Sequence, residues 1–291
     1  MIKLLALDLD GTLLNSRGEI PQKNIEAIQK AEQEGVLVTI ATGRRFRDAL
    51  PVAEQLKLNA PVICHNGALL KYADTLETVH VSILAAETVK EVLRVGKAFG
   101  GNALLSCDPV GKGVLLYDAI SDENIPLQKY IAWSKRLHGA EAEEAVHQVE
   151  NLAAVIDTIE TVHVSFSGRL APMAELEMIL RDELNSSAMI LTTVYSKLDF
   201  TLIDVLPPDA SKGIAVEKLA LINNLSAENV MVVGDNFNDL EMLEYAGTPV
   251  VMGNAAPELL ERKAFYQTLS NDENGVALAI EKFILGDFNG K

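Results

Sequence analysis

Hydrophobic positions follow two different periods in the first part of the chain. Residues 2–7 and 36–41 are short runs of apolar and β-branched residues, and such runs predict strands that are buried on both faces. Residues 21–34 have helical spacing, with Pro near the start and Gly just past the end. A helix over 45–55 and a strand over 61–64 continue the alternation, which predicts a parallel sheet with helices on its faces.

The pattern changes in the middle of the chain and then returns. Residues 66–80 are hairpin-like with a turn at Ala73-Asp74, and short strands alternate with acidic helices from Ser82 to about Tyr195. After Pro207-Pro208 the first pattern resumes, with helices predicted over 213–224, 239–244 and 274–285 and strands over 229–233 and 248–252. We therefore expect a Rossmann-like, doubly wound α/β core formed by residues 1–82 and 206–291, interrupted by an inserted α/β domain over 83–205.

Composition narrows the classes of partner. The chain has 291 residues, of which 48% are hydrophobic, and a net charge of −16 with a pI near 4.7. Nucleic acids and anionic membranes are bound mainly by Lys and Arg, so neither is expected as a partner. Asp8 and Asp10 interrupt the first apolar run before it reaches the length of a signal core, and Cys64 and Cys107 form no redox or metal motif. We expect a cytoplasmic protein with two buried thiols.

Acidic residues gather where the predicted strands end. Asp8 and Asp10 follow the first strand, and Asp235 follows a late one. Residues two apart on an extended strand point the same way, and ligands of α/β sheets bind at the carboxyl ends of the strands. Three carboxylates there are suited to Mg²⁺. Asp-x-Asp alone is equally compatible with a solvated turn, although a charge beside a buried strand is costly without a partner.

Four segments resemble, in the right order, the motifs of the haloacid dehalogenase superfamily. They are Asp8-Leu9-Asp10-Gly11-Thr12, Thr42-Gly43-Arg44, Ser211-Lys212-Gly213 and Gly234-Asp235-Asn236-Phe237-Asn238-Asp239. Two further segments, Asn66-Gly67-Ala68 and Met252-Gly253-Asn254-Ala255, resemble the Cof-type branch, which has a large α/β cap of type C2. In that branch the cap lies between the second and third motifs, where the pattern places the inserted domain.

The resemblance implies a phosphatase mechanism with an aspartyl-phosphate intermediate. Asp8 would be the nucleophile and Asp10 the general acid and base. Mg²⁺ would be held by Asp8, the backbone carbonyl of Asp10, and Asp235. Lys212 would supply a fixed positive charge, although taken alone it reads as a solvated residue at a helix start.

The remaining motif residues are expected to bind phosphate or to support the site. The Thr42 hydroxyl, the amides of Leu9 and Gly43, and Asn238 would hold phosphoryl oxygens together with Lys212. Asp239 would orient Lys212 or a metal-bound water, and Asn238-Asp239 would also cap the following helix. Arg44 and Asn66 are candidate contacts for the leaving group. The default interpretation of Arg44 is an exposed, solvated charge.

The expected function is Mg²⁺-dependent hydrolysis of small phosphorylated metabolites, such as sugar phosphates or the phosphates of flavin and pyridoxal cofactors. Two alternatives stay open: a phosphotransferase or phosphomutase on the same scaffold, and a phospho-accepting binding module without catalysis. A dehalogenase is disfavoured because an acid and base at Asp10 suits a phosphoryl leaving group.

Overall fold

The chain divides into two compact units in a computed structural model, which describes residues 1–286 apart from the side chain of residue 197. Unit 1 contains Met1–Arg44, Ala49–Val79 and Ser211–Lys291, and unit 2 contains Arg45–Asp48 and His80–Ala210. Unit 1 is therefore assembled from both ends of the chain, and the unit bounds differ by a few residues from those read from the hydrophobic pattern.

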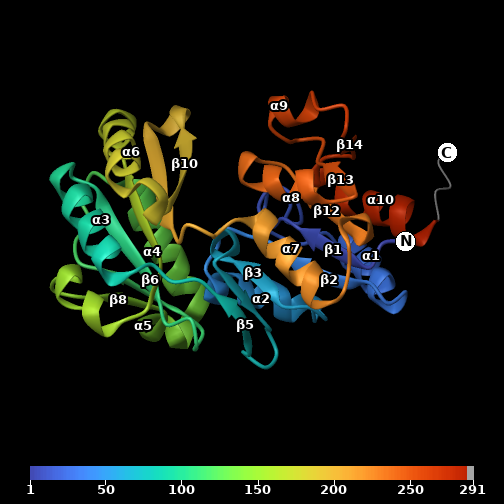
Figure 1. The fold of residues 1–291 in the computed structure, drawn as a ribbon, viewed down its shortest axis with the longest axis horizontal. Helices are drawn as coiled ribbons and strands as arrows, with labels where there is room; N and C mark the ends of the chain where they lie inside the picture. Colours follow the sequence, from blue (N-terminus) through green and yellow to red (C-terminus); the bar gives the residue numbers. More distant parts are fainter. Residues whose placement is uncertain (287–291) are drawn as a thin grey trace. The chain divides into compact units, whose positions relative to one another are not determined.

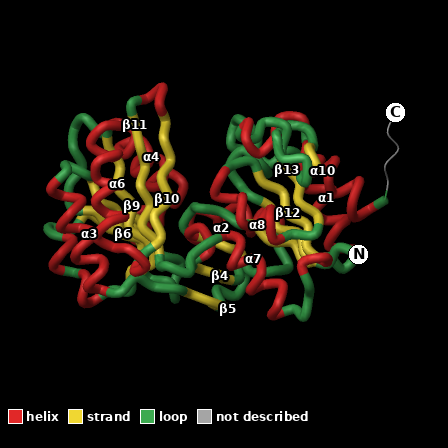
Figure 2. Tube along the Cα trace, turned by 45° about the horizontal axis from the view of Figure 1, so that its top comes forward, coloured by secondary structure: helices red, strands yellow, loops and turns green. Residues whose placement is uncertain are grey.

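Unit 1 is built on a five-stranded sheet, shown in Figures 1 and 2. Its strands, in spatial order, are β14 (Tyr266–Gln267), β13 (Thr248–Val251), β12 (Val230–Gly234), β1 (Leu4–Leu7) and β2 (Leu37–Ile40). All four pairings are parallel. Every residue of β1 is buried, as expected for a central parallel strand with helices on both faces.

Helices flank this sheet. They are α1 (Gln22–Gln33), α2 (Phe46–Leu56), α7 (Lys212–Ile222), α8 (Leu240–Tyr245), α9 (Pro257–Leu260) and α10 (Gly275–Ile280), with a π-helical turn at Glu281–Leu285. On one face Leu4 and Ala6 of β1 pack with Ala215 and Leu219 of α7. Helix α1 packs against α10, so that the first and last helices of unit 1 are neighbours.

The third predicted strand is real but does not join the parallel sheet. Strand β3 (Val62–Cys64) pairs antiparallel with β4 (Leu69–Lys71), and β5 (Thr78–Val81) completes a separate three-stranded sheet. Among the described residues, an isolated parallel bridge between Ala41, just after β2, and Ile63 links the two sheets. A tight turn at His65–Gly67 folds the chain back on itself, so β3 takes its neighbour in sequence as partner, and this part of the sequence-based expectation was wrong.

Unit 2 contains a six-stranded sheet, whose strands are seen beside their helices in Figure 2. In spatial order they are β10 (Met189–Tyr195), β11 (Phe200–Leu206), β9 (Thr161–Gly168), β6 (Asn102–Cys107), β7 (Val114–Tyr117) and β8 (Val146–Gln148). Pairing is antiparallel except between β7 and β8. This fits the lack of long parallel-strand runs in that part of the sequence.

Two pairs of helices bury the two faces of the unit 2 sheet. Leu105 lies in a core with α3 (Ala86–Ala98) and α6 (Leu170–Leu184), while the adjacent Leu104 lies in a second core with α4 (Ile125–His138) and α5 (Ala142–Ala145). Because neighbouring strand residues point to opposite faces, the two cores are on opposite sides of the sheet.

A buried polar network fixes the short segment that unit 2 takes from residues 45–48. Arg45 Nε and Nη2 donate to the two carboxylate oxygens of Asp48, both at 2.9 Å. The Tyr130 hydroxyl and a His138 ring nitrogen contact the same carboxylate, and Ser134 Oγ accepts from Arg45. A buried charge pair is stable only when its remaining donors and acceptors are satisfied, as they are here.

Cys64 and Cys107 are both buried free thiols, which confirms the prediction. Within residues 1–286 we find no helix that has the length and apolar character needed to traverse a bilayer.

Candidate active site

The end of β1 places two carboxylates in different surroundings. Asp8 continues the strand pairing through its N–H, which donates to the Val233 carbonyl at 2.9 Å, and its side chain is buried. Asp10 lies beyond it with 59% of its side chain exposed. Arg44 forms a two-pronged ion pair with Asp10, from Nε to Oδ2 at 2.8 Å and from Nη2 to Oδ1 at 2.6 Å. The default interpretation of Arg44 as a solvated charge was therefore wrong.

Lys212 is the first residue of α7 and is 2% exposed. Ser211 caps the helix by accepting a hydrogen bond from the Ile214 N–H at 3.1 Å, and this cap directs the lysine inward. Lys212 Nζ donates to Asp8 Oδ1 at 2.6 Å and to Asp239 Oδ1 at 2.7 Å. The interpretation of this lysine as a solvated helix-start residue is thus excluded.

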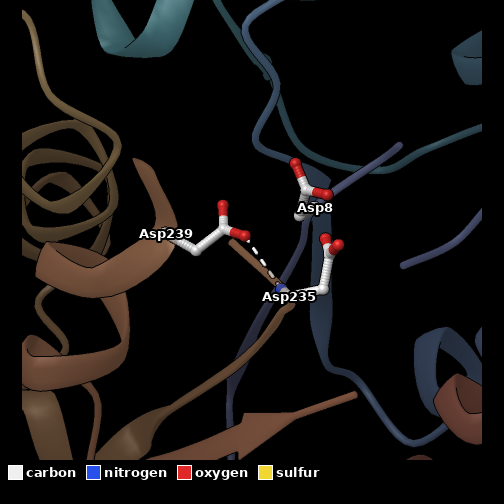
Figure 3. A group of neighbouring side chains, drawn as sticks. All are labelled: Asp8, Asp235 and Asp239. Carbon is white, nitrogen blue, oxygen red and sulfur yellow. Dashed lines mark hydrogen bonds between the residues drawn. The ribbon is translucent and has the colours of Figure 1, made fainter. Parts of the chain in front are cut away.

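The loop after β12 supplies the other two carboxylates, which Figure 3 shows beside Asp8. The second oxygen of Asp239 accepts from the N–H groups of Asp235 and Asn236 at 2.9 and 3.0 Å, so both of its oxygens are engaged. Asp235 Oδ1 accepts from the Thr12 hydroxyl at 3.0 Å. Asp239 therefore contacts Lys212, as predicted, and also shapes the loop that carries Asp235.

The charges in this cluster are strongly coupled. Burial raises the pKa of Asp8 well above its usual range, and Asp239 raises it further, while Lys212 opposes both. Burial, and next the Asp239 charge, raise the pKa of Asp235 to about 6. Burial lowers the pKa of Lys212, but the Asp239 and Asp8 carboxylates outweigh it and the net shift is upward. Lys212 is therefore a permanent cation among carboxylates that carry excess negative charge.

This excess makes the cluster suitable for a divalent cation. One oxygen from each of Asp8, Asp235 and Asp239 lies within 4.8 Å of the others. Hard oxygen donors of this kind fit Mg²⁺, which usually takes one or two carboxylates and keeps several waters. Since both oxygens of Asp239 are occupied by the protein, Asp8 and Asp235 are the carboxylates best placed to bind a metal ion.

Three predicted phosphate-binding residues and the candidate leaving-group contact Asn66 lie after the strands β2, β3 and β12. Thr42 follows β2, is buried, and accepts the Arg44 N–H with its hydroxyl at 3.1 Å. Asn66 has a left-handed backbone, with φ of 51°, and its N–H donates to the Thr42 carbonyl. Asn238 donates from Nδ2 to Asn66 Oδ1 at 3.1 Å. A side chain on Gly43 would press against the Asn66 amide, so these four residues pack closely.

Leu9 lies between the two aspartates with its side chain fully buried, and its carbonyl accepts the Leu14 N–H at 2.9 Å.

The sequence did not predict Thr12 or Glu241 as site residues. Glu241 forms a hydrogen bond with Ser211, the residue that caps the helix of Lys212. Only the position of Thr12 inside the first motif signalled a role; nothing local marked Glu241.

Comparisons with known proteins extend beyond these motifs. The model of the family described as "haloacid dehalogenase-like hydrolase" matches residues 5–280 of this chain. The chain is 30% identical over 296 residues to 5-amino-6-(5-phospho-D-ribitylamino)uracil phosphatase YwtE of Bacillus subtilis, covering 99% of this chain and 100% of that protein. It is 30% identical over 260 residues to pyridoxal phosphate phosphatase YbhA of Escherichia coli, covering 87% and 88%.

A solved structure is similar over nearly the whole fold. The haloacid dehalogenase-like hydrolase from Bacteroides thetaiotaomicron superposes with a TM-score of 0.80 at 25% sequence identity, covering 97% of this chain and 99% of that one. The likenesses in sequence and in fold thus extend far outside the acidic cluster.

Proposed function

The chain belongs to the haloacid dehalogenase-like hydrolase family, as its motifs predicted, and from this we propose that it is a Mg²⁺-dependent phosphatase of small phosphorylated metabolites. The observation that supports this most is the buried contact of Lys212 with Asp8 and Asp239. It joins the first, third and fourth motifs around one lysine and puts a positive charge beside the carboxylate that would attack the phosphate.

In the proposed reaction Asp8 is the nucleophile and Asp10 the acid and base. A carboxylate oxygen of Asp8 attacks phosphorus, the bond from phosphorus to the ester oxygen breaks, and Asp10 gives its proton to that oxygen. Asp10 then takes a proton from a water that attacks the aspartyl-phosphate. The bond from phosphorus to Asp8 breaks, and inorganic phosphate leaves with the carboxylate restored.

The approach of one anion to another has to be made favourable. Lys212 provides a fixed positive charge next to the nucleophile, held in place by Asp239. Asp8, Asp235 and the backbone carbonyl of Asp10 would hold Mg²⁺, which when bound would neutralise charge on the phosphate and on the carboxylates.

The phosphoryl oxygens would be held by donors from several strand ends. We assign the Thr42 hydroxyl, the amides of Leu9 and Gly43, Lys212 and Asn238 to this task, since backbone and side-chain donors at such turns favour phosphate.

Two further residues border the acid and the phosphate site. We assign Arg44, which pairs with Asp10, to contacts with the leaving group, and Asn66 to the support of Asn238.

The substrate class follows from the relatives. One is named for a phosphorylated ribityl compound of flavin chemistry and another for pyridoxal phosphate, so sugar phosphates and cofactor phosphates are the proposed substrates. The inserted domain, expected over 83–205, would select the leaving group. The buried free thiols Cys64 and Cys107 agree with a reducing cytoplasm as the compartment.

Hydrolysis of p-nitrophenyl phosphate with added Mg²⁺ tests the proposal, followed by a panel of sugar and cofactor phosphates. Asp8→Asn should abolish turnover and EDTA should remove it reversibly. Asp74→Asn changes an exposed carboxylate in the hairpin turn and serves as the matched control. Full activity in Asp8→Asn, or an enzyme indifferent to EDTA, would contradict the mechanism. Transfer of the phosphoryl group with little free phosphate would instead support a phosphotransferase.

A further inference from the structure

Two asparagines hold the loop that follows Asp10. Asn254 Nδ2 donates to the Gly11 carbonyl at 2.8 Å, and its Oδ1 accepts the Asn271 N–H at 2.9 Å. Asn271 Nδ2 then donates to the Leu14 carbonyl at 2.9 Å. The two side chains therefore connect both ends of residues 11–14 to a part of the chain some 240 residues away, and we call them the asparagine clamp.

The loop needs such support because its backbone is unusual. Gly11 has φ of +86°, in the left-handed region, which turns the chain sharply after Asp10. Inside the loop the N–H groups of Leu13 and Leu14 bond back to the carbonyls of Asp8 and Leu9 at 3.3 and 2.9 Å. These bonds use N–H groups of the loop, whereas the clamp donates to the carbonyls of Gly11 and Leu14.

The clamped loop connects two functional positions. Asp10 precedes Gly11 directly, and Thr12 within the loop donates its hydroxyl to Asp235 at 3.0 Å. A shift of the Gly11 peptide would move the Asp10 carboxylate relative to Asp8 and disturb the contact with Asp235. Misplacement of a reacting group by about 1 Å can cost about 10²-fold in rate.

We propose that Asn254 and Asn271 are positioning residues that hold Asp10 in its working place relative to Asp8. The inference rests on the proposed function, in which Asp10 is the acid and base. It gives a physical task to the Met252-Gly253-Asn254-Ala255 segment, which the catalytic assignment leaves unused. The clamp touches neither phosphate nor leaving group in this assignment, so it acts on the rate of the chemical steps and not on the binding of the substrate.

Asn59 offers a matched control in the same unit. Like Asn254 it is exposed, donates from Nδ2 to a carbonyl, that of Val36 at 3.0 Å, and accepts an N–H with Oδ1, that of Val38 at 2.8 Å. Asn59→Ala thus removes the same two kinds of hydrogen bond at the start of β2, away from the catalytic loop.

The experiment compares kcat, KM and Tm for wild type, Asn254→Ala, Asn254→Asp and Asn59→Ala with p-nitrophenyl phosphate. We expect kcat to fall at least tenfold in both Asn254 variants, with KM within threefold, while Asn59→Ala keeps kcat within twofold at a similar loss of Tm. Asn254→Asp keeps the acceptor for the Asn271 N–H but has no donor for the Gly11 carbonyl. The fall in kcat of this variant therefore reports on the hydrogen bond to Gly11. Wild-type kcat in either Asn254 variant overturns the proposal, as does an equal fall in Asn59→Ala.

Amide hydrogen exchange supplies a readout that does not depend on activity. Peptides covering residues 9–17 should exchange faster in Asn254→Ala than in wild type, and unchanged in Asn59→Ala. Unchanged exchange in Asn254→Ala would overturn the clamp. If wild type hydrolyses no phosphomonoester, the proposed function fails, and the exchange data still decide whether the asparagines hold the loop.

Discussion

Replacing Lys212 by Met removes the only basic side chain that contacts both Asp8 and Asp239 among the described residues. Methionine has a similar length and is apolar, so the change deletes the charge and leaves most of the packing. The two carboxylates would remain buried, at 5% and 0% exposure, without their shared partner. Activity and stability should both respond.

The magnitude follows from the geometry. At ~4 Å and an effective dielectric near 20, one pair of unit charges interacts by about 4 kcal/mol. If the phosphoryl transition state feels this interaction, its loss lowers the rate by about 10³-fold. Removing one partner of a buried ion pair costs about 3–5 kcal/mol of stability. Protonation of Asp8 relieves part of the unpaired charge, and protonation of Asp235 removes a neighbouring negative charge, so the stability loss should be smaller at pH 5 than at pH 8.

Steady-state hydrolysis of p-nitrophenyl phosphate and urea unfolding at pH 5 and pH 8 measure the two effects. Lys23→Met, on the exposed face of α1, is the control and should match wild type in both assays. A Lys212→Met enzyme within tenfold of wild-type kcat/KM would refute the electrostatic reasoning. Equal stability losses at the two pH values would refute the assignment of the raised pKa values to Asp8 and Asp235.

Three further predictions concern other positions. Gly11→Ala should abolish activity because the new methyl group meets the Asp235 carboxylate, whereas Gly18→Ala, at φ of +77° with open space around it, should keep activity despite similar backbone strain. The pKa of Asp235 is about 6, above its ordinary value of 3.8. The protonated carboxyl therefore stabilises the fold below pH 3.8, and this contribution of about 3 kcal/mol to the free energy of unfolding is lost as pH rises through 6. Because Mg²⁺ would compensate the ionised carboxylate, it should raise Tm more at pH 7.5 than at pH 5. Burial alone would raise the pKa of Asp48, but hydrogen bonds from His138 and Arg45 lower it overall. Asp48→Asn should therefore lower Tm at pH 7. Calorimetry should show the difference in Tm between variant and wild type closing only below about pH 4.

Much of the fold was predictable because buried parallel strands have a strong local signature. The runs at residues 2–7, 36–41 and 229–233 are strands in one sheet, and the helices between them begin and end close to their predicted bounds. The exception is the strand at 61–64. Its apolar sequence resembles the others, but the turn that follows it, which determines its partner, involves left-handed residues that the pattern does not show.

The candidate site was predictable as a list of residues but not as a set of contacts. Asp8, Lys212 and Asp239 come from three motifs, and the spacing within each motif is local. Their hydrogen bonds, between residues as far as 204 positions apart, exist only because β1 and β12 pair side by side and α7 begins beside them. Arg44 and Asn254 stand in family-like segments, but nothing local predicts the ion pair of Arg44 with Asp10 or the contacts of the asparagine clamp.

The sequence by itself determined the chemistry that is available: carboxylates at strand ends, one lysine at a helix start, and an acidic surface of net charge −16 that disfavours polyanions. Only the tertiary structure decided the state of these groups. Asp8 and Asp10 are two residues apart, yet one is buried beside a lysine and the other is exposed beside an arginine. The pKa and the role of a carboxylate depend on burial and on neighbouring charges within a few ångströms, and those neighbours are distant in sequence.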